Sequence, residues 1–284
     1  MKASGVKYLL LALMLSSCAS LEQTQALIPA ETIAARAPGD GKRLVIVLPG
    51  RGDDLAGLKA TGIAAVIQEQ MPDAEVVLVG LTFPYYTEGR SVQRLHEEIV
   101  LPARARGRSE VYLAGASMGG MGVLLYEREH PNQLSGLVLM APYMGGAAVI
   151  EEVRAAGGLR HWRAGPRPEQ VNGDNVAREE WRVAQSWLDN PGRAQRVWLI
   201  CGQGDAFHPA AQLLGALLPA GNYIAPAGGH SWRVWKEGAS AAFSQVARIS
   251  LKLTSSATTP MTSPSLPLNV AEAVRQNSSV AAER

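Results

Sequence analysis

Cysteine is scarce in this chain, which has only Cys18 and Cys201 among its 284 residues. Two cysteines exclude the dense disulfide framework that stabilises many small secreted domains. Cys201 closes the apolar run 197–201, so we expect it to be a small buried hydrophobic side chain and not a reactive thiol.

Charge is also limited, since charged residues make up 18% of the chain and its formal net charge is +2. Lys2 and Lys7 are two of the 27 basic residues, so a chain without residues 1–17 would carry 25 basic and 25 acidic side chains. No basic block points to a nucleic-acid partner. No His, Cys, Asp and Glu cluster has metal-ligand spacing, and we predict neither a metal nor another cofactor.

The N-terminus has the pattern of a secretion signal. Lys2 and Lys7 form a short positive region before the apolar stretch Tyr8–Leu15, which is too short to span a bilayer as a helix. The next residues, Leu15-Ser16-Ser17-Cys18, resemble a bacterial lipobox. This resemblance implies a signal peptide at residues 1–17 and a lipidated Cys18. The alternative is an ordinary secretory signal cut near Ala19.

The lipobox resemblance also implies a place in the cell. A lipidated Cys18 would anchor the chain in the bacterial cell envelope. Residue 19 is alanine and not aspartate, which in enteric-type sorting implies the outer membrane. We therefore expect the protein to contact a membrane through its N-terminal lipid.

The middle of the chain has the alternation of a single α/β domain, expected over residues 42–254 after a linker at 18–41. The strand-like apolar runs are Arg43–Leu48, Glu75–Leu81, Glu110–Ala114, Leu134–Ala141, Arg196–Cys201 and Asn222–Pro226. The helical patterns are Leu55–Gln70, Ser91–Ala105, Gly119–His130, Ala210–Leu218 and Ser231–Leu253. This order predicts a mostly parallel sheet flanked by helices.

Two segments break this rhythm. Residues 144–191 contain three tryptophans and two amphipathic pieces, Ala147–Ala156 and Asn175–Leu188, so we predict a helical cap insertion at one end of the sheet. Residues 255–284 are dominated by Ser, Thr, Pro and Ala and lose apolar periodicity. That composition predicts a disordered tail.

One glycine-rich pentapeptide, Gly115-Ala116-Ser117-Met118-Gly119, joins a strand-like run to a helical one. The pattern G-x-S-x-G at a strand-to-helix turn is typical of an exposed serine nucleophile. The small flanking residues permit a sharp turn, and the following helix N-terminus favours developing negative charge. Ser117 is therefore the candidate nucleophile, and a serine in an ordinary tight turn is the alternative.

A serine nucleophile requires a base, and the base requires an orienting acid. Of the five histidines, His230 lies on a glycine-rich loop after the last strand-like run, where a base would be placed; a structural loop histidine is the alternative. Asp205 follows the preceding strand-like run, and its alternative role is to cap the helix near Pro209. Ser117, Asp205 and His230 occur in the Ser–Asp–His order of one hydrolase fold.

Together these loops resemble those of the α/β-hydrolases, and the resemblance covers roughly residues 42–253. It implies that Ser117 attacks an ester, His230 takes its proton and Asp205 holds the imidazolium. It also implies an oxyanion hole made by the N–H groups of Met118 and Arg51. In the loop Pro49-Gly50-Arg51-Gly52-Asp53, Gly50 matches the family's glycine, whereas Pro49 replaces its usual histidine.

Two other interpretations of this loop are open. The Arg51 side chain is a candidate to bind a substrate carboxylate or phosphate, with a solvated loop arginine as the alternative. A dinucleotide-binding loop is disfavoured because the third glycine position of that fingerprint is Leu55.

The expected function is a serine hydrolase that cleaves carboxylic esters through an acyl-enzyme, with a small-molecule or lipid ester as substrate. An envelope acyltransferase, a thioesterase or a lipase would use the same three side chains. A non-catalytic binding protein with a hydrolase fold is a further alternative. The sequence predicts no oligomeric state.

Overall fold

The computed structural model describes residues 26–257. The expected signal peptide, Cys18 and residues 258–284 of the expected tail lie outside the described residues. The described residues fall into two units that divide after residue 247, and the sheet lies in the first. No helix within residues 26–257 is long and apolar enough to cross a membrane.

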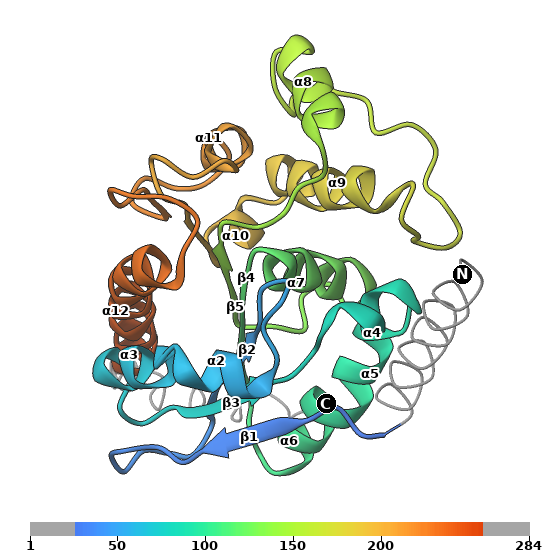
Figure 1. Ribbon diagram of the computed structural model, residues 1–284. Helices are drawn as coiled ribbons and strands as arrows, with labels where there is room; N and C mark the ends of the chain where they lie inside the picture. The colour runs from blue at the N-terminus through green and yellow to red at the C-terminus, as the bar shows by residue number, and fades with distance from the viewer. Residues whose placement is uncertain (1–25, 258–284) are drawn as a thin grey trace, which may run out of the picture. The chain divides into compact units, whose positions relative to one another are not determined.

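Seven strands form one sheet in the order β1-β3-β2-β4-β5-β6-β7 (Figure 1). Their bounds are β1 Ala30–Ile33, β2 Arg43–Leu48, β3 Glu75–Val79, β4 Glu110–Ala116, β5 Gly136–Met140, β6 Val197–Ile200 and β7 Tyr223–Ile224. Every neighbouring pair is parallel except β1 and β3. The central strands are buried along nearly their whole length, as expected for a parallel sheet covered on both faces. The predicted fold class is confirmed.

The edge strand β1 was not expected, because it lies within the segment assigned to a linker. It pairs antiparallel with β3, with Ala30 opposite Val79 and Ile33 opposite Val76. Its four residues, Ala-Glu-Thr-Ile, alternate between exposed and half-buried. A strand this short and polar has no apolar run, so composition alone indicates a linker.

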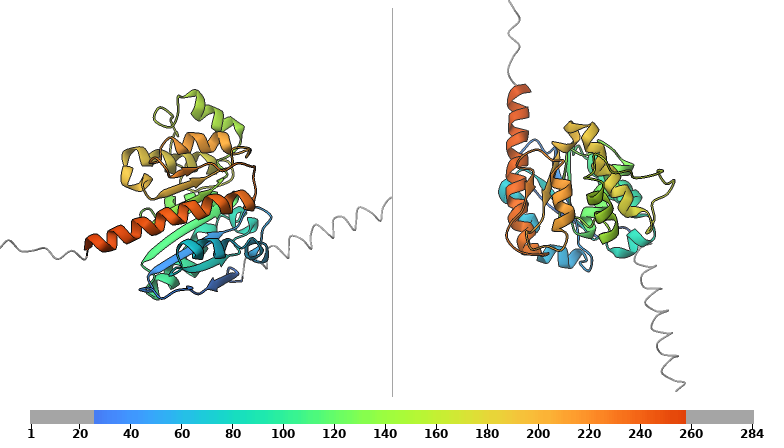
Figure 2. Two further views of the ribbon diagram at one scale, coloured as in Figure 1. Left: turned by 90° about the vertical axis from the view of Figure 1, so that its left-hand side faces the viewer. Right: turned by 90° about the horizontal axis from the view of Figure 1, so that it is seen from above.

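The helices cover both faces of the sheet (Figures 1 and 2). They are α2 Leu55–Ala60, α3 Ile63–Gln70, α4 Phe83–Thr87, α5 Ser91–Leu95, α6 Leu101–Ala105, α7 Met118–Glu129, α8 Ala147–Ala155, α9 Val176–Asp189, α10 Pro191–Ala194, α11 His208–Gly215 and α12 Trp232–Ala257. A hydrogen bond of 3.2 Å from the Gln70 amide to the Ser240 hydroxyl joins α3 to α12 on one face. Helix α7 packs against β2, β4 and β5 on the other.

Two predicted helices are divided in the structure. The pattern at 55–70 forms α2 and α3, because Gly62 between them adopts a φ of +72°. The pattern at 91–105 forms α5 and α6 with a π-helical turn, His96–Val100, between them. Both segments stay helical overall, so their apolar faces still cover the sheet.

The insertion at 144–191 holds helices α8 and α9. Its tryptophans Trp162, Trp181 and Trp187 are at most 2% exposed, and they belong to the same buried core as the sheet. The Trp181 indole donates to the Met144 carbonyl at 2.9 Å, which fixes α9 to the chain just after β5. The Arg128 guanidinium of α7 donates to the buried Glu179 carboxylate at 2.8 Å, so α9 is joined to α7 by an ion pair.

Candidate active site

Ser117 forms the turn between β4 and α7. Its backbone has φ +53° and ψ −112°, a conformation that is rare for a residue with a side chain. Three backbone hydrogen bonds hold it: Ser117 N–H donates to Met140 O at 2.8 Å, and Ser117 O accepts from Tyr143 N–H at 3.0 Å and Met121 N–H at 3.2 Å. The surrounding chain therefore maintains the strained turn at which the candidate nucleophile lies.

The two glycines of the motif allow this turn to close. A Cβ added at Gly115 would lie 2.2 Å from the carbonyl oxygen of Gly119. A Cβ added at Gly119 would lie 2.6 Å from the carbonyl oxygen of Pro49. The glycines thus let β4, α7 and the loop after β2 approach one another at backbone distance.

Asp205 and His230 lie in contact. The Nδ1 atom of His230 is 2.8 Å from Oδ2 and 3.0 Å from Oδ1 of Asp205. The Asp205 side chain is fully buried, and its Oδ1 also accepts from the Phe207 N–H at 2.8 Å. The Asp205 carboxylate therefore holds the imidazole of His230 and also accepts a backbone N–H in the turn before α11. This second contact resembles the helix-capping role that was the alternative for Asp205.

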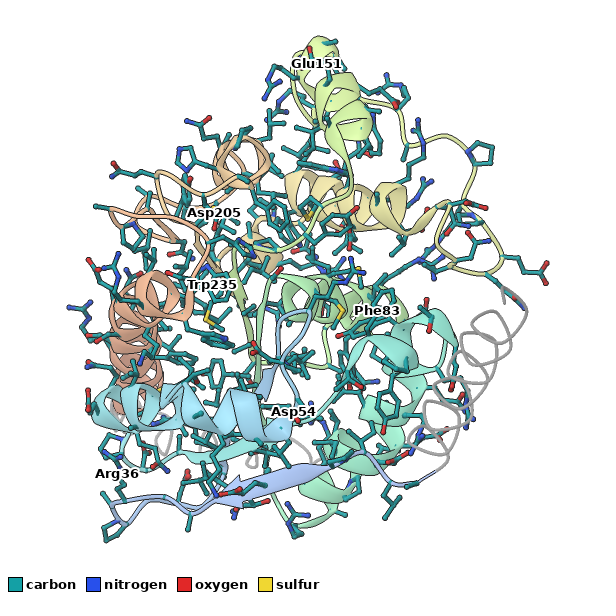
Figure 3. The ribbon with its side chains drawn as sticks, viewed as in Figure 1. Arg36, Asp54, Phe83, Glu151, Asp205 and Trp235 are labelled. Carbon is teal, nitrogen blue, oxygen red and sulfur yellow. The ribbon has the colours of Figure 1, made fainter. Side chains whose placement is uncertain are left out.

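The loops that carry these two side chains are bonded to each other. Gly204 N–H donates to Gly228 O at 2.8 Å, and Gln203 N–H donates to Pro226 O at 2.9 Å. The His230 ring is packed edge-on between Phe207 and Trp235, with ring centroids 4.7 and 4.6 Å away. Figure 3 shows the labelled Asp205 and Trp235 in this region. These contacts fix the orientation of the imidazole.

Ser117 follows β4, Asp205 follows β6 and His230 follows β7, so all three lie at the carboxyl edge of the parallel sheet. A series of contacts leads from Ser117 through Tyr143 to Phe207, whose ring lies 5.7 Å from that of Tyr143 and which contacts His230. Within residues 26–257, no hydrogen bond joins the Ser117 hydroxyl to His230. Catalytic hydrogen bonds of this kind often form only when substrate binds.

The loop after β2 lies against the nucleophile turn. A Cβ added at Gly50 would lie 3.8 Å from the Ser117 Cβ. Asp53 N–H donates to Gly50 O at 3.2 Å to close the turn, in which Gly52 has φ +93°. The Trp232 indole donates to the Asp53 carboxylate at 2.8 Å, which ties this loop to the start of α12. The Arg51 backbone thus lies at the tip of a turn beside Ser117.

Aromatic side chains that the sequence did not single out lie near these residues. Helix α4 contributes Phe83, which is 44% exposed, and Tyr86, which packs on a small apolar cluster of Met118, Met121 and Leu125. Tyr143 is 37% exposed, and its ring contacts that of Phe207. No local pattern distinguishes these aromatic residues from core residues, because only the tertiary arrangement leaves Phe83 and Tyr143 open to solvent.

Other side chains that could take part in catalysis lie elsewhere or are inert. His96 stacks on His130 with ring centroids 3.8 Å apart and its Nδ1 lies 2.8 Å from the Tyr126 hydroxyl. Cys201 is completely buried, and this burial raises the pKa of its thiol to about 12. The expected role of Cys201 as a buried hydrophobic side chain is confirmed.

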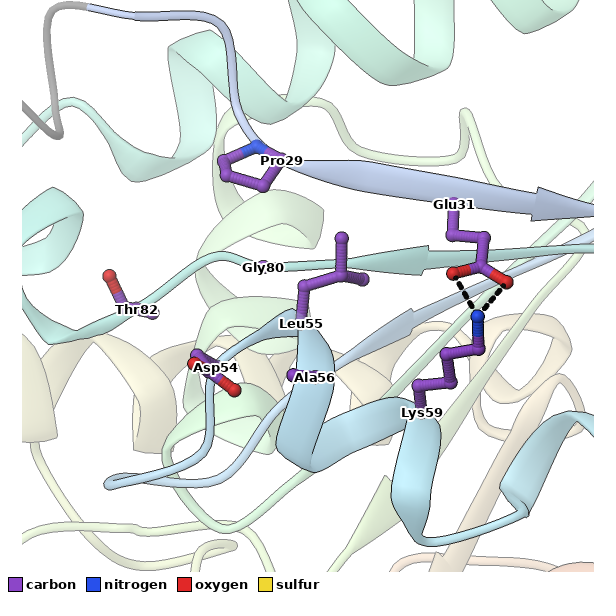
Figure 4. Close-up of a pocket in the computed structure, with 8 residues that line it drawn as sticks. All are labelled: Pro29, Glu31, Asp54, Leu55, Ala56, Lys59, Gly80 and Thr82. Carbon is purple, nitrogen blue, oxygen red and sulfur yellow. Dashed lines mark hydrogen bonds and ion pairs between the residues drawn. The ribbon is translucent and has the colours of Figure 1, made fainter.

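A pocket of about 430 Å³ lies between β1, α2 and the end of β3 (Figure 4). Its walls are Pro29, Glu31, Asp54, Leu55, Ala56, Lys59, Gly80 and Thr82. An ion pair of 2.9 Å joins Lys59 to Glu31 at its side. None of Ser117, Asp205 and His230 lines this pocket, so it is distinct from the site described above.

Comparison with known proteins agrees with this architecture. Residues 91–187, which include Ser117 and most of the insertion, match the model of a family described as serine aminopeptidase, S33. A search of curated protein sequences gave no match.

Solved structures with a similar fold include esterases and a serine hydrolase. Est1E from Butyrivibrio proteoclasticus aligns with a TM-score of 0.54 and 15% identity, over 79% of this chain and 95% of that one. FphF, a fluorophosphonate-binding serine hydrolase of Staphylococcus aureus, aligns with a TM-score of 0.53 and 12% identity, over 78% and 99%. A ferulic acid esterase aligns with a TM-score of 0.53 and 14% identity, over 79% of this chain and 100% of that one. The fold of this chain is therefore that of the α/β-hydrolases.

Proposed function

We propose that this protein is a serine hydrolase that cleaves carboxylic esters with Ser117, His230 and Asp205. The observation that carries the proposal is the hydrogen bond between Asp205 and His230, at the sheet edge where Ser117 forms its strained turn. A buried carboxylate that holds one ring nitrogen of a histidine leaves the other nitrogen available as a base.

The proposed mechanism follows from this arrangement. Because Nδ1 of His230 faces Asp205, Nε2 is the nitrogen that takes the proton as the Ser117 hydroxyl attacks the ester carbonyl. The N–H groups of Met118 and Arg51 stabilise the oxyanion. His230 then protonates the leaving alcohol, and an acyl-enzyme forms on Ser117. A water molecule deprotonated by His230 releases the acid and restores the serine.

An ester is favoured over other acyl substrates by the neighbouring structures and by the walls of the site. Est1E has also been solved with ferulic acid bound, and a ferulic acid esterase shares the fold. The exposed rings of Phe83 and Tyr143 suit a substrate with an apolar or aromatic part. The matched family description names an aminopeptidase, so aminoacyl 4-nitroanilides belong in the same assay as 4-nitrophenyl esters.

The test is steady-state hydrolysis of 4-nitrophenyl butyrate by wild type, Ser117→Ala, His230→Ala and Asp205→Asn. We expect kcat to fall by roughly 10⁴-fold or more for the first two and by about 10³- to 10⁴-fold for the third. Ser109→Ala is the matched control, because Ser109 is exposed near the opposite end of β4 and its loss should leave kcat unchanged.

Three outcomes would redirect the proposal. Full activity in Ser117→Ala would contradict it. Products esterified to an added alcohol would favour an acyltransferase. A folded wild-type protein that hydrolyses no ester, thioester or anilide would favour a binding protein.

We also propose that Cys18 anchors the enzyme in the cell envelope through a lipid. The support is the lipobox-like sequence at 15–18, which lies outside the described residues. Metabolic labelling of a bacterial host with palmitate should modify wild type and not Cys18→Ser. Label that persists in the variant would contradict the anchor.

A further inference from the structure

Arg51 occupies a distinctive position beside the nucleophile. It follows Gly50, whose Cβ position lies 3.8 Å from the Ser117 Cβ. Its side chain is exposed, and its guanidinium carbon lies 4.8 Å from the centroid of the Phe83 ring. A guanidinium stacked on an aromatic face is oriented in advance, while the N–H groups at its edge stay free to donate.

The Arg51 guanidinium has no acidic partner among residues 26–257. The two acids nearest in sequence are already engaged, since the Asp53 carboxylate accepts from Trp232 and the Asp54 carboxylate accepts from Gly57 N–H at 2.7 Å. Elsewhere the chain pairs such groups, as in the bond of 2.7 Å from Arg193 to Glu127. The Arg51 guanidinium beside the site therefore has N–H donors available for an anion.

Phe83 links this arginine to the rest of the site. It lies on α4 three residues before Tyr86, so the two side chains project from the same face of the helix. Tyr86 packs on Met118 and Met121 of the nucleophile helix. Helix α4 thus spans from the loop after β2 to α7, and its exposed Phe83 ring gives Arg51 an apolar support.

We propose that the Arg51 side chain determines specificity by selecting esters that carry a carboxylate, with the apolar part of the substrate against Phe83. This inference rests on the proposed function and adds a substrate class to it. Guanidinium donates two parallel hydrogen bonds to a carboxylate, and hydrogen bonds to charged groups are the stronger ones. The two carboxylates near the site are both engaged. Asp205 is buried and paired with His230, and Asp53 accepts from the Trp232 indole.

The experiment compares esters that differ only in charge. The first pair is the 4-nitrophenyl monoester of adipic acid and its methyl adipate counterpart, which place the carboxylate or its neutral ester on the acyl half. The second pair is 3-(butyryloxy)benzoate and its methyl ester, which place it on the alcohol half. The readout is the ratio of kcat/KM for the charged and neutral member of each pair.

We expect wild type to prefer the charged member of at least one pair by about tenfold or more. In Arg51→Gln that ratio should fall to about one, and Arg51→Lys should restore only part of it because a lysine makes no bidentate contact. Arg36→Gln, which removes an exposed arginine near the amino-terminal end of the sheet, should keep the wild-type ratio. The preference should also weaken as salt concentration rises.

The ratio separates specificity from catalysis. The Arg51 N–H is a proposed oxyanion donor, and any disturbance of it lowers kcat/KM for both members of a pair. A wild-type ratio of one in both pairs, or a wild-type ratio kept by Arg51→Gln, would overturn the inference and leave the esterase proposal intact. Hydrolysis of the neutral esters by Ser117→Ala would instead overturn the proposed function itself.

Discussion

Ser117 shows how individual residues shape the site, because its strained backbone depends on the two glycines around it. Each glycine lies where a Cβ would meet a carbonyl oxygen at 2.2 to 2.6 Å. Contacts this short cannot be relieved by turning a side chain, since both partners are backbone. The position of Ser117 thus depends on the absence of a Cβ atom at Gly115 and Gly119.

We therefore predict that Gly115→Ala lowers both activity and stability. The added methyl would push the first turn of α7 away from β4, with a loss of about 2 kcal/mol or more in unfolding free energy. Denaturant titration and 4-nitrophenyl butyrate hydrolysis measure the two effects. Gly173→Ala is the control, because a Cβ there meets nothing within 4 Å. Equal stability of both variants would contradict this account of the turn.

Glu180 on α9 is a second residue with an unusual environment. It is completely buried, and within residues 26–257 neither carboxylate oxygen has a hydrogen-bond partner. Burial raises the pKa of this carboxyl well above its usual value of 4.5. The charged side chains nearby are paired with one another, as Glu179 is with Arg128 and Arg182.

This environment predicts that Glu180 makes the fold less stable as pH rises. Above about pH 4.5 the unfolded chain releases this proton while the folded chain keeps it. The folded state then binds more protons, so unfolding free energy falls by up to about 1.4 kcal/mol for each pH unit until the folded pKa is reached. Chemical denaturation from pH 4 to pH 8 measures the slope.

The matched comparison is Glu180→Gln, which keeps the shape and cannot ionise. The stability difference between wild type and variant should shift in favour of the variant as pH rises. Glu180→Met should also be more stable than wild type near pH 7, because it removes unpaired polar atoms. A difference that is constant across this pH range would contradict the buried, protonated state.

At the scale of elements, α9 is attached to α7 by a buried ion pair. The Glu179 side chain is 1% exposed, and it accepts from Arg128 at 2.8 Å and from Arg182 at 2.9 Å. Its removal would leave the Arg128 guanidinium, which is only 7% exposed, without its buried partner. Breaking one side of such a pair costs more than the pair itself contributes.

We predict that Glu179→Ala lowers the free energy of unfolding by about 3 kcal/mol. Glu151→Ala is the control, because Glu151 is 64% exposed and pairs with an exposed Arg154 on α8. The free energy of unfolding of Glu151→Ala should stay within about 0.5 kcal/mol of the wild-type value. Thermal or urea denaturation compares the two, and similar losses would show that α9 is not held to α7 by this pair.

The elements also show how far the sequence determines the fold. Most of the six predicted strands were predictable because they are continuous apolar runs, such as Leu44–Leu48, that only a doubly covered sheet buries. The edge strand β7 is two half-buried residues within the predicted run 222–226. Strand β1 was not predictable, since its polar residues are held by backbone pairing with β3. The division at Gly62 was also missed, because a glycine within a helical pattern does not reveal its φ.

The candidate site could be predicted to a similar degree. Asp205 and His230 follow from motif and chain order, and the structure brings them to 2.8 Å. Their contact with Ser117 stays a prediction. Phe83, Tyr143 and Trp232 could not be foreseen as parts of the site, because their positions depend on packing between distant segments. Sequence patterns therefore identify the candidate catalytic residues more readily than the aromatic residues that lie near them.

At the scale of the whole first unit, parallel strands gather loops that are far apart in the chain. The bond of 2.8 Å from the Trp232 indole to the Asp53 carboxylate joins residues 179 positions apart. It connects the proposed oxyanion loop to the segment that carries His230. We infer that this hydrogen bond fixes the position of the proposed oxyanion loop relative to the segment that carries His230.

We predict that Trp232→Phe lowers kcat by about tenfold with little change in KM. The indole N–H is lost, so the loop at Gly50–Asp53 is held less firmly where the oxyanion forms. Trp198→Phe is the matched control, because the Trp198 indole donates to Gln245 away from the site. An unchanged kcat in Trp232→Phe would show that the loop needs no such support.

The proposed mechanism depends on Ser117 as a nucleophile activated by His230. The most direct measurement is intact mass and peptide mapping after brief exposure to a fluorophosphonate probe, with wild type, Ser117→Ala and His230→Ala compared side by side. We predict one rapid adduct on the peptide that contains Ser117, none in Ser117→Ala and very slow labelling in His230→Ala. Folded wild type that stays unlabelled, or an adduct on another residue, would contradict it.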